Sequence, residues 1–144
     1  MEKVTNILTR KHPHFNTISP LCTVSDALHR MCCENVDHLI VLEGDDYRGV
    51  LSEHDITVKL MYFSKPLNKI YVQDIMNTGL PVANNEDTLE RCMLLMKQFS
   101  VRYLPVFDGL IFKGIISSDD IIEEAVFNRT DIFDPQREEP SLFA

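Results

Sequence analysis

The chain has 144 residues, of which 44% are hydrophobic and 25% are charged, and its formal net charge is −8. This composition is typical of a globular protein, and the acidic balance opposes binding to nucleic acid or to an anionic membrane surface. No apolar run approaches the ~20 residues of a membrane-spanning helix, and the first residues form no signal peptide, so we expect a cytoplasmic protein.

The N-terminal segment contains a short apolar turn with Val4, Ile7 and Leu8, followed by a polar link with the sequence His12-Pro13-His14. Two nearby histidines can suggest a metal site. Pro13 favours an extended path here and no third ligand is evident, so we predict no metal at this link.

A helix is predicted to begin at Thr23, because Asp26 three residues later completes a capping box and apolar residues then recur at helical spacing. The same pattern returns with Asp87 or Thr88 as the cap. The apolar positions of the two helices are Val24, Ala27, Leu28 and Met31, then Leu89, Cys92, Met93 and Met96. We expect both faces to pack in the core rather than to form an exposed methionine-rich groove.

Two pairs of short apolar runs follow these helices, 38–42 with 47–51 and 103–107 with 111–116. Each pair is separated by a turn that contains glycine, which predicts a β-hairpin that leads into a further helix. The predicted unit is therefore strand, helix, strand, strand, helix, present twice. We divide the chain into a first repeat (1–64), a connector (65–70), a second repeat (71–127) and a mobile acidic C-terminal tail (128–144).

The two predicted units share one seven-residue stretch, Gly49–Asp55 in the first and Gly114–Asp120 in the second. The segments 23–56 and 88–121 align around it without a gap, with more identities than chance explains. We infer an internal duplication whose two short units share a core, since each alone would be marginally stable.

The end of each stretch, Ser-x-x-Asp at 52–55 and 117–120, allows two interpretations. The first is a helix cap, in which the serine oxygen accepts a backbone N–H and the aspartate reaches back. The second is ligand recognition at a helix N-terminus, where free N–H groups suit a phosphate and the aspartate can accept hydrogen bonds from both ribose hydroxyls.

The duplicated unit that ends in Gly-hydrophobic-x-Ser-x-x-Asp, with Tyr-Leu-Pro-Val at 103–106, resembles a tandem pair of CBS domains, or Bateman module, over roughly residues 2–127. The resemblance implies an α+β fold of two pseudo-symmetric β-α-β-β-α repeats packed into one module. It also implies a regulatory sensor whose clefts bind AMP, ADP, ATP or S-adenosylmethionine, with no catalytic cofactor. In this family two modules commonly pair into a flat disc, so the resemblance further implies a homodimer and an unseen effector protein.

The resemblance also implies a set of site residues. The ribose hydroxyls would bind Asp55 and Asp120. The phosphate or its equivalent would lie near Ser52, His54, Ser117 and Arg102. The base pocket would be lined by Ile18, Leu39, Val82, Leu104 and Pro105.

The chain departs from the family pattern at several of these positions. Many members carry a cation directly before the motif aspartate, whereas this chain has His54 in the first copy and acidic Asp119 in the second. The counterpart of Arg102 in the first repeat is Asp37, which cannot bind a phosphate. We therefore expect two inequivalent sites, of which the first-copy site would be preferred by a ligand with several phosphates.

Two other classes of function make different demands on the sequence. A ligand-free dimerisation or protein-interaction module would need only the caps and the apolar faces. An enzyme is not expected: Cys32 and Cys33 with His29 and His38 could suggest a thiol nucleophile, but Cys32 is predicted on the apolar face of its helix, away from any cleft. The four cysteines contain no C-x-x-C pair, which argues against a zinc site or a disulfide framework.

Overall fold

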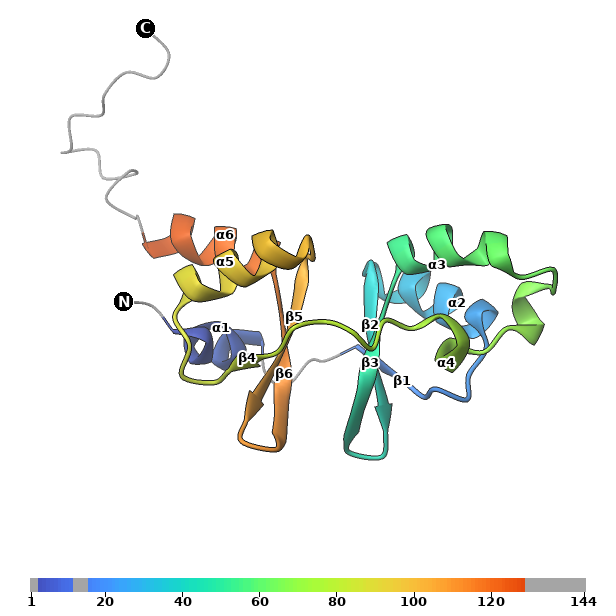
Figure 1. The fold of residues 1–144 in the computed structure, drawn as a ribbon, viewed down its shortest axis with the longest axis horizontal. Helices are drawn as coiled ribbons and strands as arrows, with labels where there is room; N and C mark the ends of the chain where they lie inside the picture. Colours follow the sequence, from blue (N-terminus) through green and yellow to red (C-terminus); the bar gives the residue numbers. More distant parts are fainter. Residues whose placement is uncertain (1–2, 12–15, 129–144) are drawn as a thin grey trace, which may run out of the picture.

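The computed structural model describes residues 3–11 and 16–128. These residues form two halves that lie side by side, each built from a three-stranded sheet flanked by helices (Figure 1). The predicted link at His12–His14 and the predicted tail from residue 129 onward lie outside the described residues.

The first half contains one sheet with the strand order β1-β2-β3. Its elements are β1 (Thr17–Ile18), α2 (Val24–Glu34), β2 (His38–Glu43), β3 (Asp46–Ser52) and α3 (Glu53–Lys59), followed by 3-10 turns at Leu60–Tyr62 and Leu67–Lys69. Strand β1 pairs parallel to β2, and β2 pairs antiparallel to β3 as the predicted hairpin.

The second half repeats this arrangement with the strand order β4-β5-β6. Its elements are β4 (Ala83–Asn84), α5 (Leu89–Phe99), β5 (Tyr103–Asp108), β6 (Ile111–Ser117) and α6 (Ser118–Asn128). Two short helices complete the fold, α1 (Val4–Lys11) and α4 (Val72–Ile75). The predicted order of strand, helix, strand, strand, helix is confirmed in both halves, as is the α+β class.

Helices α2 and α5 begin where local chemistry predicts. Thr23 Oγ1 accepts the N–H of Asp26 at 3.1 Å, and the Asp26 carboxylate accepts the N–H of Thr23 at 3.0 Å, which completes the capping box of α2. In α5 the cap is Thr88 rather than Asp87. Both helices end at a residue in the left-handed region, Asn35 and Ser100, so the two repeats share their C-terminal geometry as well.

The first and fourth helices are exchanged between the halves. Helix α1 packs into the core of the second half, where the N–H of Val4 donates to the carbonyl of Asp87 at 3.1 Å. Helix α4 packs into the core of the first half, where the N–H of Val24 donates to the carbonyl of Ile70 at 2.8 Å. Each packing unit therefore combines residues from both predicted repeats, which ties the halves together.

A third apolar cluster joins the two sheets. Ile40, Val50 and Ile115 are buried there, and Tyr47 stacks on Phe112 with ring centroids 4.9 Å apart. Burial raises the pKa of the Tyr47 hydroxyl to about 12, so this side chain stays neutral at physiological pH. The cluster gives the two halves the shared core that the duplication predicts.

The glycine of the first motif lies where another segment of chain crosses β3. The backbones of Val50 and Asn77 exchange two hydrogen bonds, of 3.1 and 2.8 Å. A Cβ atom at position 49 would lie 2.7 Å from the carbonyl oxygen of Asn77. Gly49 is therefore required by this backbone contact, which holds the segment that follows α4 against the sheet.

Candidate functional site

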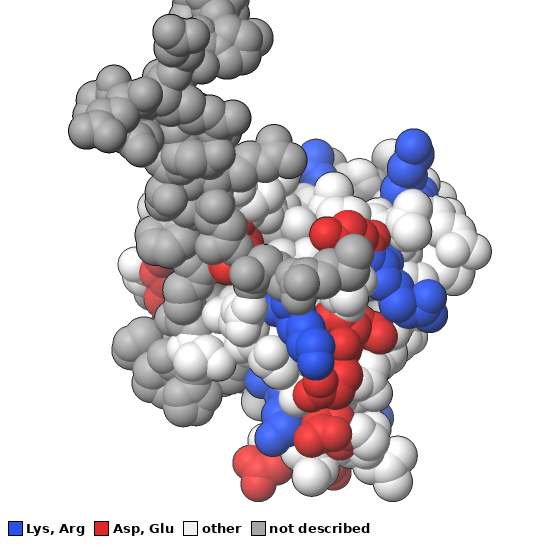
Figure 2. All heavy atoms as spheres, turned by 90° about the vertical axis from the view of Figure 1, so that its left-hand side faces the viewer, with Lys and Arg blue, Asp and Glu red and all other residues white. Residues whose placement is uncertain are grey.

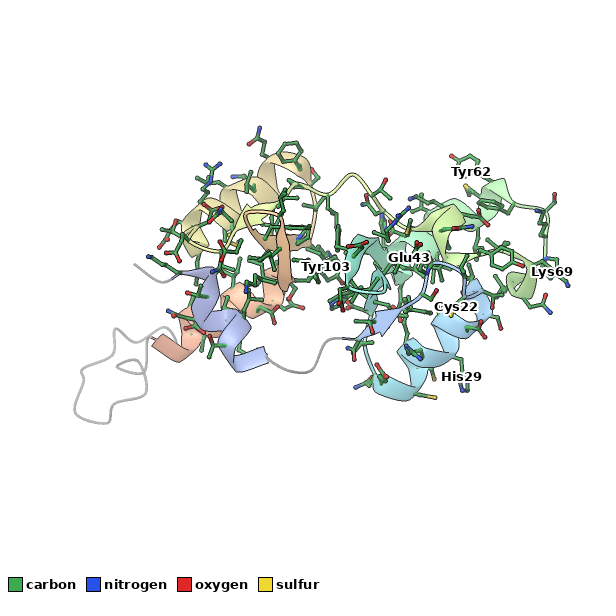
Figure 3. All side chains as sticks on the ribbon, turned by 90° about the horizontal axis from the view of Figure 1, so that it is seen from below. Cys22, His29, Glu43, Tyr62, Lys69 and Tyr103 are labelled. Atoms are coloured by element: carbon green, nitrogen blue, oxygen red, sulfur yellow. The ribbon has the colours of Figure 1, made fainter. Side chains whose placement is uncertain are left out.

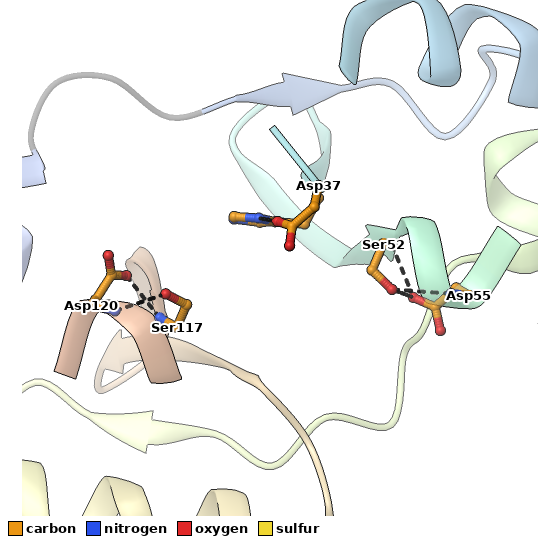
Figure 4. A network of polar contacts seen from close by, with 6 residues as sticks. Asp37, Ser52, Asp55, Ser117 and Asp120 are labelled. Carbon is orange, nitrogen blue, oxygen red and sulfur yellow. Dashed lines mark hydrogen bonds and ion pairs between the residues drawn. The ribbon is translucent and has the colours of Figure 1, made fainter. Parts of the chain in front are cut away.

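Both Ser-x-x-Asp segments form helix caps at the junction of the halves (Figure 4). In the first, the backbone N–H and the hydroxyl of Ser52 both donate to Asp55 Oδ2, at 3.0 and 2.8 Å, and the N–H of Asp55 donates to Ser52 Oγ at 3.1 Å. In the second, Ser117 and Asp120 make the corresponding backbone bonds at 2.8 and 3.1 Å. The capping interpretation of the motif is therefore confirmed, and any ligand role must use the same groups.

The first cap forms one wall of a cavity of about 560 Å³ between the halves, which we call the first cleft. This volume lies within the range of small-molecule sites. Its lining residues are Asp37, Val50, Ser52, Glu53, His54, Asp55, Thr57, Asn77, Leu80, Ser100, Val101, Arg102 and Tyr103. The first half contributes the cap. The second half contributes the three residues that connect α5 to β5 and Tyr103, the first residue of β5.

A second, more open cavity of about 680 Å³ lies beside the other cap, and we call it the second cleft. Ser117 and Asp119 line it together with Asp37, Glu53 and His38, but Asp120 does not. No lysine or arginine is found among its lining residues in the described chain. The two clefts therefore differ in charge, because Arg102 lines the first one only.

Asp37 lies at the boundary of both clefts and is held by residues of both halves. His38 Nδ1 lies 3.0 Å from Asp37 Oδ1, and the ring of His38 lies 4.5 Å from that of Tyr103, which Figure 3 shows at the junction of the halves. Burial alone would raise the pKa of Asp37, but hydrogen bonds from His38 and from the Tyr103 hydroxyl outweigh it and lower that pKa. Burial and the neighbouring Asp37 raise the pKa of Tyr103. The carboxylate of Asp37 is therefore ionised at neutral pH.

The thiols of the chain do not form a catalytic arrangement with the first cleft. Cys33 Sγ lies 3.6 Å from His29 Nε2 on the exposed face of α2. Cys32 is also exposed and lines the second cleft, so its predicted place on the apolar face is wrong. Cys92 is buried, and burial raises the pKa of its thiol to about 11. Within the described residues, no group of three potential ligands could hold a metal ion.

Known proteins resemble this chain over most of its length. A model of the CBS domain matches residues 72–126. The CBS domain-containing protein YhcV of Bacillus subtilis is 28% identical over 114 residues, which are 79% of this chain and 81% of that protein. The hexameric CBS-CP12 protein from bloom-forming cyanobacteria is 30% identical with a TM-score of 0.72, over 95% of this chain and 76% of that one. This chain belongs to the CBS domain family.

Two further solved CBS structures resemble the fold. The CBS domain protein NE2398 has a TM-score of 0.81 and 29% identity, over 88% of this chain and 99% of that one. CBSX2, solved in complex with AMP, has a TM-score of 0.73 over 89% of this chain and 98% of that one; its identity of 22% supports the fold alone.

Part of one enzyme also resembles the CBS repeats of this chain. Homoserine O-acetyltransferase of Methanococcus vannielii is 26% identical over 121 residues, but the chain spans only 24% of that enzyme.

None of the described helices is both long enough and apolar enough to span a membrane.

Three predicted site residues of the first CBS repeat lie together in one cleft. Ser52, His54 and Asp55 line the first cleft together with Arg102 from the second repeat. Ser117 lines the second cleft, where Asp120 forms the cap behind it.

The predicted base-pocket residues do not line either cleft. Leu39 and Leu104 are fully buried in the cores of the two halves, because alternate residues of β2 and β5 face opposite sides of each sheet. Ile18 is buried in the first core. Pro105 is buried and Val82 is 52% exposed, yet neither contributes to a cleft wall.

Sequence reasoning missed the residues that replace them in the first cleft. Val101 and Tyr103 directly flank Arg102 in the sequence. Because Arg102 is a predicted phosphate contact, its neighbours could have been predicted to line the same cleft. Asn77 and Leu80 carry no such signal, because they reach the cleft only through the backbone crossing at Gly49.

Proposed function

We propose that this CBS protein is a regulatory module that binds an adenosyl ligand in the first cleft and passes the resulting change to a partner or to a second copy. The observation that carries this proposal is the meeting of Asp55, from one half, with Arg102, from the other half, in one cavity of about 560 Å³. A ligand that contacts both would bridge the halves and favour one of their relative orientations.

The ribose of the ligand would bind at Asp55. The cap uses Oδ2 of this carboxylate, and the other oxygen points away from Ser52 (Figure 4). Among the described residues, Oδ1 of Asp55 makes no hydrogen bond, so it is the oxygen that would accept the ribose hydroxyls. Ser52 would position this carboxylate, since its own hydroxyl is engaged in the cap.

The two ends of the ligand would meet different surroundings. The side chain of Arg102 is exposed in the cleft and would contact a phosphate, with His54 on the opposite half. Val50, Leu80 and Tyr103 offer the apolar and aromatic surface on which an adenine ring would pack. At the second cleft only Ser117 of this pair would lie by the corresponding phosphate, because Asp120 forms the cap behind it and does not line the cleft.

The class of ligand is supported by the family. CBSX2 was solved with AMP, and the family resemblance adds ADP, ATP and S-adenosylmethionine as candidates for this chain. The ligand is bound and released unchanged in this proposal, so the module needs no catalytic cofactor.

A thermal-shift measurement with these four compounds tests the proposal. A ligand at ~100 times its dissociation constant should add about 2.7 kcal/mol to the free energy of unfolding and raise Tm by several degrees. The 2′-deoxy form of the binding nucleotide is the matched probe, and it should shift Tm less because it lacks one of the two ribose hydroxyls. If none of the four compounds shifts the Tm of ligand-free protein, the sensor function is contradicted.

A second candidate function, self-association, is favoured by exposed apolar side chains on neighbouring helices. Helices α3, α5 and α6 lie along one side of the molecule (Figure 1). The exposed apolar residues of these helices and of the turn after α3 are Val58, Met61, Tyr62, Met93, Leu94, Phe99, Ile122 and Val126. Met93 was expected in the core of α5, but it is 39% exposed and belongs to this surface.

We propose that this surface forms a homodimer. The CBS-CP12 relative is described as hexameric, which supports self-association in general. Sedimentation equilibrium should give twice the mass of the chain, and Leu94→Asp should shift the protein towards monomer. A monomer at all concentrations would contradict the dimer.

Acidic and basic side chains are interleaved on the described part of the face in Figure 2, which offers nucleic acid or a membrane no single basic patch.

A further inference from the structure

The first cleft has an unbalanced set of charges for a site that would hold phosphate groups. Three carboxylates line it, those of Asp37, Glu53 and Asp55, against a single guanidinium, that of Arg102. His54 is the other titratable basic group of this lining. Each further negative charge on a bound ligand therefore meets more repulsion than attraction.

Asp37 is one of the two lining carboxylates that would not hold the ribose, and its side chain is 56% exposed. Its side chain contacts His38 at 3.0 Å and accepts a hydrogen bond from the Tyr103 hydroxyl of the other half. Its backbone carbonyl accepts the N–H of Glu53 at 3.0 Å. In Figure 4 its carboxylate lies between the two caps, where a phosphate chain extending from the ribose would approach it.

The internal duplication shows what this position could otherwise hold. The counterpart of Asp37 in the second repeat is Arg102, and both residues line the first cleft. A basic residue at both positions would present two cations to a phosphate chain. With aspartate at position 37, one cation remains and a negative charge lines the same cleft.

We propose that Asp37 makes the first cleft select adenosine ligands with one phosphate or none over ADP and ATP. This inference rests on the proposed function, because it concerns the ligand of the same cleft. The expectation that a ligand with several phosphates would prefer the first-copy site over the second compares the two sites and stays a prediction.

Calorimetric titration of the full chain with AMP, ATP and adenosine tests this inference. Magnesium-free buffer of low ionic strength is used, so that neither a cation nor salt masks the charges. We expect the wild-type protein to bind AMP about 10-fold more tightly than ATP. Asp37→Asn should reduce this ratio of affinities about 5-fold, because removing one unit charge near the phosphates changes the affinity a few-fold. The amide oxygen of the variant can still accept the hydrogen bond from His38, and its NH2 group can donate to the Tyr103 hydroxyl oxygen.

Asp46→Asn is the matched control, since it makes the same charge change at the exposed start of β3, outside the cleft. It should leave the ratio of AMP to ATP affinity unchanged. High ionic strength should reduce the ratio of AMP affinity to ATP affinity in the wild-type protein. This measurement tests the repulsion between the carboxylates and the phosphates without any variant.

The outcomes separate this inference from the function on which it rests. Three results overturn the inference and leave the proposed function intact. These are tighter binding of ATP than of AMP, a ratio of AMP affinity to ATP affinity that does not change with salt, and a ratio that is the same in Asp37→Asn and in the wild type. If AMP, ATP and adenosine all fail to bind, the proposed function fails and the inference fails with it.

Discussion

Asp55→Ala is expected to weaken AMP binding about 100-fold, because it removes the charged acceptor of both ribose hydroxyls, a loss of about 3 kcal/mol. Titration calorimetry of the variant and the wild type measures this loss. The same substitution removes half of a capping box and should lower the free energy of unfolding by about 1 kcal/mol. Chemical denaturation separates this loss of stability from the loss of binding.

Asp26→Ala is the matched control for the cap. Asp26 makes the same capping box with Thr23 at the start of α2, but it lines neither cleft. We expect this variant to lose the same half of its capping box and to keep the AMP affinity of the wild type. If Asp26→Ala and Asp55→Ala weaken binding equally, the effect at position 55 is one of stability and the ribose role is refuted.

Gly49→Ala is expected to lower the free energy of unfolding by about 2–4 kcal/mol. The added Cβ would meet the carbonyl oxygen of Asn77 at 2.7 Å, and a backbone atom cannot rotate out of the way as a side chain can. The segment must then move, and the two hydrogen bonds between Val50 and Asn77 are strained or lost. Because Asn77 also lines the first cleft, ligand affinity should fall as well.

Gly79→Ala provides the comparison within the same segment. A Cβ there would have its nearest contact at 3.7 Å, with a side-chain atom of Asn77, so we expect little change in stability. Urea denaturation of the two variants measures the difference. Equal midpoints for Gly49→Ala and Gly79→Ala would show that the crossing at β3 does not need a glycine.

The order of the elements could be predicted from the sequence because its signals are local. The caps at Thr23 and Ser52 and the hairpins each depend on residues a few positions apart. The exchange of α1 and α4 between the halves could not be predicted in this way. These helices have eight and four residues, and only contacts with distant residues decide which core they join.

The candidate site could likewise be predicted only where its residues depend on local sequence signals. Ser52 and Asp55 follow from the motif, since their spacing alone makes the cap. The family resemblance implies that Leu39 lines the base pocket, but the alternation of its strand turns this side chain into the core. Asp37 could not be recognised as a shared wall residue until both halves were placed, because its contact with Tyr103 joins positions far apart in the sequence.

A crystal structure of the full chain grown with AMP tests the central claim most directly, namely that an adenosyl ligand binds between the two halves at the first motif. The account predicts AMP in the first cleft, with its ribose hydroxyls within hydrogen-bond distance of Asp55 Oδ1 and its phosphate near Arg102. AMP bound to one half alone, or at a site outside the cleft that lacks Asp55, would contradict it.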